Sequence, residues 1–165
     1  MGQQQLLLVI LVTIIVGIAT VVAINTFGTA ADQANIDAVN NDIATLASAA
    51  QGYYMRPAML GGGGRTFDGG DDGDGISLNG LAFPADAVSE DGQTAVNENG
   101  RYIISQVQDQ AFTITAHPSS CEGYTPGLTG DNCVDDDQIT AGVGPNTFEL
   151  GATAGEIDPE EGEGG

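Results

Sequence analysis

The feature that most constrains this chain is a long apolar stretch close to its N-terminus. The first 31 residues carry no charged side chain, and the 19 residues from Leu6 to Ile24 are interrupted only by Thr13, Gly17 and Thr20. As an α-helix this stretch spans about 28 Å, close to the ~30 Å hydrocarbon core of a bilayer. Such a surface has to be buried in a membrane or against other protein.

Charge is distributed unevenly along the chain. Of 165 residues, 23 are acidic, three are arginine and none is lysine, so the net charge is −20. Residues 1–56 carry −2 of this charge and residues 57–165 carry −18. Because contact with phosphate needs Lys and Arg, we expect no nucleic-acid partner. The chain therefore combines an apolar N-terminal part with a highly acidic, glycine-rich remainder.

Three interpretations of the apolar stretch have to be compared. A cleaved signal peptide is disfavoured, because the preceding residues contain no basic side chain and the apolar run is too long. A plain membrane anchor fits the length, although the Lys and Arg that usually orient an anchor are missing. A filament-forming stalk is favoured by the residues that follow Ile24, because the helical pattern continues beyond them.

The continuing pattern is amphipathic. Apolar residues recur at steps of three and four, which is one face of a helix: Ile36, Val39, Ile43, Leu46, Ala50 and Tyr53. We expect the opposite face to carry Asn35, Asp42, Thr45 and Gln51. Pro57 and the run Gly61–Gly64 end the pattern. The sequence thus predicts one helix over about residues 3–55, roughly 80 Å long.

The rest of the chain has the composition of a small β-rich head. Asn99-Gly100 is a hairpin-turn dipeptide, and we expect Tyr102–Val107 to pair with Phe112–His117. In the second segment apolar residues alternate with polar ones, which predicts a half-buried strand with a polar face. Weaker strand candidates are 76–78 and 147–150.

The predicted fold class is therefore α+β, a long N-terminal helix with a small antiparallel head. Residues 1–56 form the stalk helix, 57–150 the acidic head with a cysteine loop, and 151–165 a flexible acidic tail.

At this point the sequence resembles the type IV pilins and pseudopilins. The resemblance covers about residues 1–60 in pattern, and the segment from Tyr53 to Gly64 is similar to that of pilin-like proteins of halophilic bacteria of the Bacteroidota and Rhodothermota. It implies a leader cut by a prepilin peptidase, insertion in the inner membrane before assembly, a pilus assembly machinery, and a homopolymer whose stalk helices bundle in the filament core. The implied core residues are Gln5, Leu6, Leu7, Leu8, Val9, Ile10, Leu11, Val12, Ile14, Ile15, Val16, Ile18, Val21, Val22 and Ile24.

The sequence departs from this family near its start. Typical mature pilins carry a glutamate at position five, thought to pair with a neighbour's terminal amine. Gln5 stands there if Met1 is the mature terminus, and Leu7 if cleavage follows Gly2. A glutamine can hydrogen-bond with an amine but cannot neutralise it.

Few residues carry chemistry. Cys121 and Cys133 are the two cysteines, and in an exported chain we expect them to form a disulfide. His117 is the single histidine, expected at a hairpin end or on the surface, so neither a zinc site nor a hydrolase triad can be assembled. We therefore expect no catalytic residue and no enzymatic activity.

The acidic clusters allow two interpretations. Asp68, Asp71, Asp72 and Asp74 lie in a glycine-rich segment that partly resembles a calcium loop, but the regular spacing and the closing Glu are missing. A second cluster comprises Asp131 and residues 135–137. The other interpretation is a solvated surface of the kind found in halophiles, where molar salt shortens the Debye length to about 3 Å. We favour this second interpretation and expect no cofactor, with calcium as the alternative.

The function expected from the resemblance is structural: the major subunit of an extracellular type IV pilus-like filament on the cell surface, for adhesion or motility. The alternatives are a membrane-anchored surface domain that binds calcium through its Asp-rich loops, a pseudopilin of a secretion system, and an archaeal flagellin-like filament.

Overall fold

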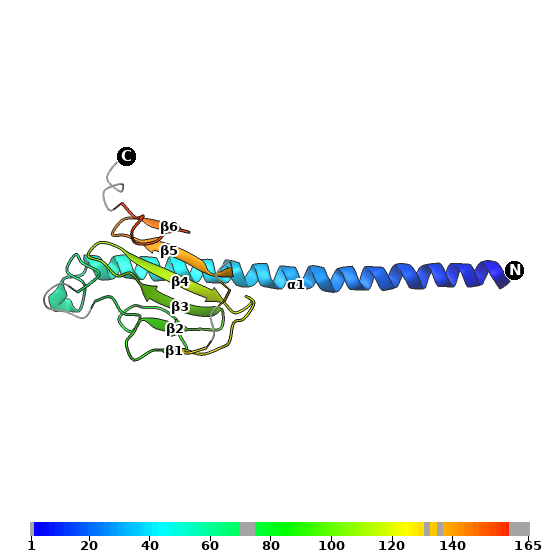
Figure 1. The fold of residues 1–165 in the computed structure, drawn as a ribbon, viewed down its shortest axis with the longest axis horizontal. Coiled ribbons are helices and arrows are strands. Elements are labelled where there is room, and N and C mark those ends of the chain that lie inside the picture. The colour runs from blue at the N-terminus through cyan, green and yellow to red at the C-terminus, as the bar shows by residue number, and fades with distance from the viewer. Residues whose placement is uncertain (1, 70–74, 131–132, 135–136, 159–165) are drawn as a thin grey trace. The chain divides into compact units, whose positions relative to one another are not determined.

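The computed structural model describes residues 2–69, 75–130, 133–134 and 137–158 (Figure 1). These residues form the expected α+β fold, a long N-terminal helix followed by an antiparallel sheet. The elements are α1 (Gly2–Met55), the 3₁₀ helix η1 (Ala58–Leu60), β1 (Ala87–Val88), β2 (Thr94–Val96), β3 (Gly100–Ser105), β4 (Phe112–Pro118), β5 (Ile139–Val143) and β6 (Phe148–Leu150). The chain comprises two units, Met1–Ala34 and Asn35–Gly165, and α1 contributes residues to both.

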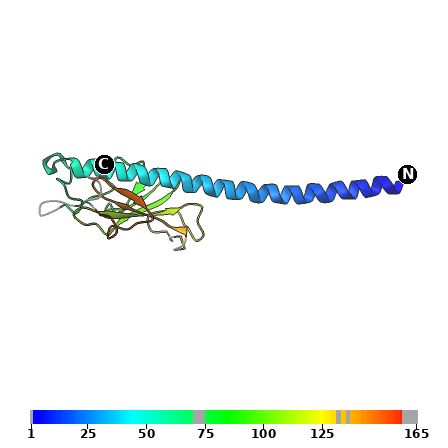
Figure 2. The ribbon, with the colours of Figure 1, turned by 90° about the horizontal axis from the view of Figure 1, so that it is seen from above.

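In the second unit, α1 packs on the sheet through the predicted apolar face. Val39, Ile43, Leu46 and Ala50 are fully buried, and Ile36 and Tyr53 are half-buried. Apart from Ile36, these residues pack in one core with side chains of β3, β4 and β5, including Tyr102, Ile104, Phe112, Ile114, Ala141 and Val143. Figure 2 shows this part of α1 lying along one face of the sheet. The three- and four-residue spacing thus identified the buried face correctly.

The prediction for the polar face of this helix is wrong for three of its four residues. Asn35 hydrogen-bonds the loop after β4, Asp42 accepts hydrogen bonds from β3 and the turn before it, and Gln51 donates to the carbonyl oxygens of Gly144 and Thr147. Most of these partners lie in the turns and loops that connect the strands, so the polar residues beside the apolar stripe also contact the sheet unit.

The glycine run after α1 forms a cap on the helix end. The N–H groups of Gly63, Gly64 and Arg65 donate to the carbonyl oxygens of Tyr53, Arg56 and Tyr54, at 2.9, 3.0 and 2.9 Å. The carbonyls of Tyr53 and Tyr54 belong to the last turn of α1, where no further N–H group of the helix is available to them, and Arg56 follows that turn directly. A Cβ atom on Gly63 would lie 2.0 Å from the carbonyl oxygen of Thr66. A side chain at Gly63 would therefore force the cap to move.

The sheet is an antiparallel meander with the strand order β1-β2-β3-β4-β5-β6 (Figure 1). The predicted hairpin is confirmed, since Ile104 of β3 lies opposite Ile114 of β4, although Val107 lies beyond the end of β3. Asn99 lies in the turn between β2 and β3, and Gly100 is the first residue of β3. The weak strand candidate 147–150 is confirmed as β6, whereas 76–78 is irregular backbone.

The polar face of β4 is not exposed, contrary to the sequence prediction. Thr113 and His117 are 3 % exposed, as buried as the apolar residues with which they alternate. The Thr113 hydroxyl accepts a hydrogen bond from the N–H of Ala154, and the His117 ring accepts one from the N–H of Cys133. Segments after β6 and before β5 therefore cover the second face of the sheet.

The covering segment after β6 lies inside the range assigned to a flexible tail. Ala152, Ala154 and Ile157 are buried and form a small apolar cluster with Ala111. The packed part of the chain thus includes residues beyond 150, and residues 159–165 lie outside the described residues.

Candidate functional site

The apolar segment, defined as Leu6–Ile24 of α1, presents its side chains to the surroundings. Every large apolar side chain in it is between 46 % and 67 % exposed in the isolated chain. This is the set predicted for the filament core: Leu6, Leu7, Leu8, Val9, Ile10, Leu11, Val12, Ile14, Ile15, Val16, Ile18, Val21, Val22 and Ile24. Gln5 is also exposed on the same helix. No part of the described chain covers the segment.

Polar groups within the segment are satisfied by the helix itself. The hydroxyl of Thr13 donates to the carbonyl oxygens of Val9 and Ile10, and that of Thr20 donates to Val16 at 2.8 Å. The backbone N–H and C=O groups pair along the helix. The segment therefore offers an almost purely apolar cylinder that is long and apolar enough to cross a membrane.

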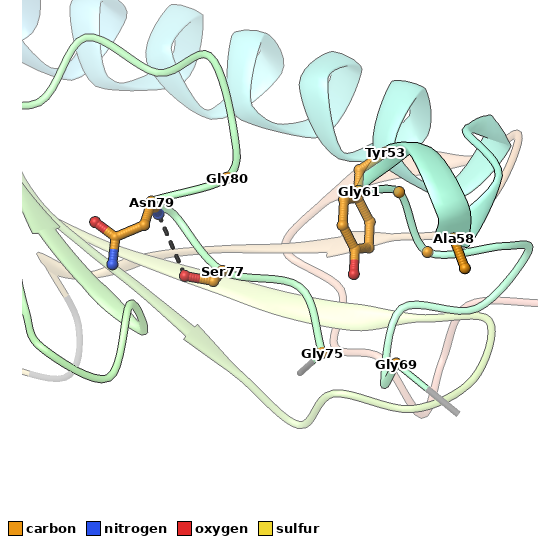
Figure 3. Close-up of a pocket in the computed structure, with 10 residues that line it drawn as sticks. Tyr53, Ala58, Gly61, Gly69, Gly75, Ser77, Asn79 and Gly80 are labelled. Carbon is orange, nitrogen blue, oxygen red and sulfur yellow. Dashed lines mark hydrogen bonds between the residues drawn. The ribbon is translucent and has the colours of Figure 1, made fainter. Parts of the chain in front are cut away.

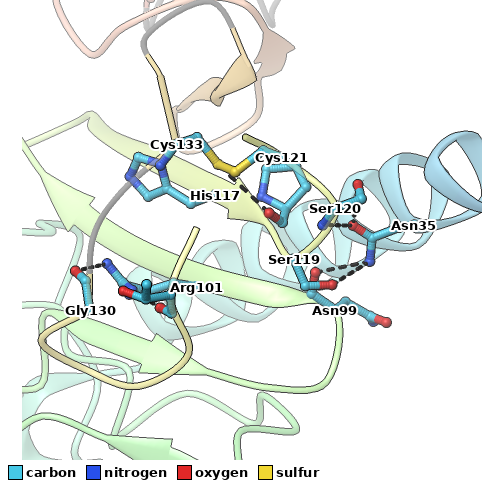
Figure 4. The surroundings of a disulfide bond; sticks show 11 residues. Asn35, Asn99, Arg101, His117, Ser119, Ser120, Cys121, Gly130 and Cys133 are labelled. Carbon is cyan, nitrogen blue, oxygen red and sulfur yellow. Dashed lines mark hydrogen bonds between the residues drawn. A yellow bond between two sulfur atoms is a disulfide. The ribbon is translucent and has the colours of Figure 1, made fainter. Parts of the chain in front are cut away.

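The predicted disulfide is present. Cys121 is bonded to Cys133, with their Cα atoms 5.6 Å apart, and it closes the loop between β4 and β5 (Figure 4). Cys133 is buried against the end of β4, where its sulfur lies 3.7 Å from the carbonyl oxygen of Pro118. The disulfide loop, residues 121–133, is thereby attached to the sheet at both of its ends.

Arg101 of β3 is the internal support of this loop, and the sequence analysis did not identify it. Its side chain is 2 % exposed, and it donates to the carbonyl oxygens of Thr125, Gly127 and Gly130 at 2.7, 2.9 and 2.7 Å. Figure 4 shows the bond to Gly130. Its guanidinium also lies 5.5 Å from the ring centre of Tyr124. A lone arginine within a β-strand pattern of a very acidic chain was the available signal.

His117 lies beside this arginine and is buried, not at the surface as expected. It is the cross-strand partner of Arg101, and its Nδ1 accepts a hydrogen bond of 3.3 Å from the N–H of Cys133. Burial, and to a lesser degree the charge of Arg101, lower the pKa of His117 below its usual 6.5. A neutral ring therefore fits this position, and Arg101, His117 and the disulfide form one structural cluster.

A second polar cluster joins α1 to the sheet. Asp42 Oδ2 accepts hydrogen bonds from Tyr102 Oη at 2.6 Å, Asn99 Nδ2 at 2.8 Å and Asn97 Nδ2 at 2.9 Å. Burial, and then the hydrogen bond to Asp42, raise the pKa of Tyr102. The tyrosine thus stays protonated and serves as a hydrogen-bond donor to the carboxylate. Three donors on one oxygen indicate a structural role.

The calcium hypothesis receives no geometric support from the described residues. Asp68 is exposed and accepts a hydrogen bond from Thr66, whereas Asp71, Asp72 and Asp74 lie outside the described residues. Asp68 also lies close to Asp109. A hydrogen bond between the two side chains, and the charge of Asp68, raise the pKa of Asp109. Within the described ranges no group of three His, Cys, Asp or Glu side chains is placed to hold a metal ion.

Thus the structure assembles two polar clusters that stabilise the sheet unit, and one extended apolar segment that has no partner among the described residues. Comparison of the chain with protein-family models, with curated proteins and with solved structures finds no match.

Proposed function

We propose that the chain is a structural, non-catalytic subunit of an extracellular type IV pilus-like filament, and that it polymerises through the apolar segment. One observation carries the proposal: the large side chains of Leu6–Ile24 are about half exposed or more in the single chain. Their burial is strongly favourable, at about 0.8 kcal/mol per CH₂ group. Outside a membrane, a bundle of the same segments from other copies provides that burial.

The remaining features agree with this role. The resemblance of residues 1–60 to pilins implies insertion in the inner membrane, cleavage by a prepilin peptidase, and passage through a pilus assembly machinery. The α+β fold, with a long N-terminal helix and an antiparallel sheet, is compatible with a pilin. The acidic sheet unit then faces solvent in the filament, where its charge keeps filaments apart.

A substitution within the apolar segment tests the proposal. Val16→Asp places a charge where other copies would pack, and Val16→Ala is its matched apolar control. Negative-stain microscopy of sheared surface material should show thin filaments for the parent chain and Val16→Ala, and none for Val16→Asp. Recovery of the parent chain only as detergent-solubilised monomers, from cells without filaments, would contradict the proposal.

A membrane-anchored surface domain is the second candidate. The specific observation in its favour is that the apolar window of α1 meets the length and composition of a membrane span. The position of the mature N-terminus shows whether the apolar segment is retained, as both the filament subunit and the membrane anchor require, or removed as a signal peptide. Mass spectrometry of filaments should find Met1 or Gln3 as the first residue, whereas a chain that begins beyond Ile24 would eliminate the stalk.

A further inference from the structure

A second exposed apolar area lies at the opposite end of α1, within the sheet unit. Among the described residues of Asn35–Gly165, the three most exposed large hydrophobic side chains are Met59, Leu60 and Met55, at 91 %, 69 % and 67 %. They lie within six residues of one another, at the end of α1 and on η1. Single exposed apolar residues are normal, whereas exposed apolar residues gathered in one place suit a contact surface.

The charges around this cluster differ from those of the rest of the unit. Residues 43–67 contain Arg56 and Arg65 and no Asp or Glu, whereas 68–165 contain 20 acidic residues and Arg101 alone. Arg56 and Arg65 are exposed, and Arg101 is buried under the disulfide loop. Arg56 follows Met55 in the chain, and the N–H of Arg65 donates to the carbonyl oxygen of Tyr54, so both arginines lie at the end of α1 that carries the exposed apolar side chains.

A pocket lies beside the apolar cluster. This pocket, of about 520 Å³, is lined by Tyr53 and Ala58 on one side and by Gly75, Ser77 and Asn79 on the other. Figure 3 shows Ala58 of η1 and the ring of Tyr53 across from the Gly75–Gly80 backbone. Small and glycine residues in the wall leave room for a side chain from a partner.

We propose that a surface at the end of α1, here called the cationic patch, docks on the acidic sheet unit of a second copy of the chain. The patch consists of Met55, Arg56, Met59, Leu60 and Arg65. Two units that each carry a net charge of −19 repel one another in most orientations. An approach that sets the cationic patch against carboxylates is the orientation in which charge attracts and apolar area is also buried. This inference rests on the proposed function, because it assigns the subunit contact made by the sheet unit.

An anionic membrane is the less favourable partner for this surface. Binding through the patch would bring a chain with a net charge of −20 close to a negatively charged leaflet, which repels it. A second copy of the chain also presents negative charge, as carboxylates that the patch can contact individually. It does not present the continuous charged surface of a membrane. The test below keeps lipid or detergent as a distinct outcome.

The experiment uses the full chain with a photo-crosslinking amino acid in place of Met59. Equal amounts of ¹⁵N-labelled and unlabelled chain are mixed, as filaments and in detergent, so that peptides joined between copies have mixed isotope patterns. We expect crosslinks from position 59 to acidic peptides of residues 68–158 of another copy. Crosslinks confined to the same chain, or to lipid or detergent, in both preparations would overturn the inference.

Two pairs of variants separate charge from apolar area. Arg56→Gln with Arg65→Gln should reduce the yield of crosslinks between copies severalfold, whereas Gln108→Glu with Gln110→Glu changes the net charge equally at exposed sites elsewhere and should not. Leu60→Ser should likewise reduce it and Val134→Ser should not, since Val134 is exposed outside the patch. Equal effects of a variant and its control would overturn the inference.

The outcomes also distinguish this inference from the proposed function. If all patch variants form filaments in the same amount as the parent chain, and no crosslink from position 59 joins two copies, the proposal for the apolar segment stands. The proposed contact of the cationic patch is then refuted. A parent chain that forms no filaments refutes the stalk proposal, and the patch is then judged by the crosslinks in detergent.

Discussion

The carboxylate of Asp42 on α1 accepts a hydrogen bond of 2.6 Å from the hydroxyl of Tyr102 on β3. These two residues are 60 positions apart in the sequence, and they connect the helix to the centre of the sheet. Because Tyr102 is fully buried, its hydroxyl has no access to bulk water and depends on this partner.

Asp42→Asn should destabilise the sheet unit. The substitution removes the charge that strengthens three hydrogen bonds and introduces donors that face the donors of Asn97 and Asn99. The loss in the free energy of unfolding should be about 2 kcal/mol. Thermal or urea unfolding of the full chain in detergent, followed by circular dichroism, measures it.

Asp137→Asn is the matched control, since Asp137 is exposed in the described part of the chain. It should change the free energy of unfolding by less than about 0.5 kcal/mol. In addition, Tyr102→Phe combined with Asp42→Asn should cost less than the sum of the two single variants, because both remove the same contact. Additive costs would show that the hydrogen bond contributes nothing to stability.

Gly63→Ala should destabilise the end of α1. Its Cβ atom would lie 2.0 Å from the carbonyl oxygen of Thr66 and 2.7 Å from the ring of Tyr53, so the cap on the helix has to move. We expect a loss of about 1–3 kcal/mol. Gly52→Ala is the control, because its Cβ meets nothing within 4 Å on the exposed side of α1. That variant should gain up to about 1 kcal/mol, and a similar loss in both would contradict the cap.

Stability should depend on the protonation of His117. Its pKa is lowered in the folded chain by burial and by Arg101, so the unfolded chain takes up a proton first as the pH falls below about 6.5. Where the unfolded state binds more protons, the free energy of unfolding falls with decreasing pH. The contribution of His117 is therefore fully present above pH 6.5 and is lost progressively between that value and the folded pKa.

His117→Gln provides the comparison. The free energy of unfolding, measured from pH 8 to pH 5, should decrease more for the parent chain than for the variant. The difference in slope is the readout, so a uniform destabilisation of the variant does not obscure it. Parallel curves would mean that His117 keeps an ordinary pKa in the folded chain.

Bulk salt, not calcium, should govern the stability of the acidic unit. Sodium or potassium chloride near molar concentration screens the repulsion among the carboxylates, so the melting temperature should rise with ionic strength for either cation. Calcium at millimolar concentration, added at fixed ionic strength and compared with chelator, should change it little. The measurement is a melting series in each salt.

A site formed by Asp68, Asp71, Asp72 and Asp74 would behave differently. Binding to the folded state would raise the melting temperature in calcium even at high salt. Asp72→Asn with Asp74→Asn would remove that rise. A large calcium shift that this double variant abolishes would favour a calcium-binding surface domain.

The helix and its buried face were predictable because they depend on local rules. Apolar spacing of three and four residues identified Val39, Ile43, Leu46 and Ala50, and Pro57 with the glycines marked the end. The β3–β4 hairpin followed from alternation between neighbouring segments, and the disulfide from cysteine count and expected export. Each of these patterns depends on residues that are close in sequence, or, for the disulfide, on two cysteines that have no alternative partner.

The tertiary structure alone decided which polar residues are buried and what they contact. Asn35 bonds Ser120, 85 residues away, and Arg101 bonds the disulfide loop more than 20 residues away. Such partners are set by the strand order and by the loops that cover the second face of the sheet, and no periodicity encodes them. A polar residue in an alternating pattern is therefore assigned to solvent, as Thr113 and His117 were. The apolar segment shows the converse: its hydrophobicity is a property of the sequence, whereas its exposure is a property of the fold, because the residues that the structure describes leave its large side chains about half exposed or more.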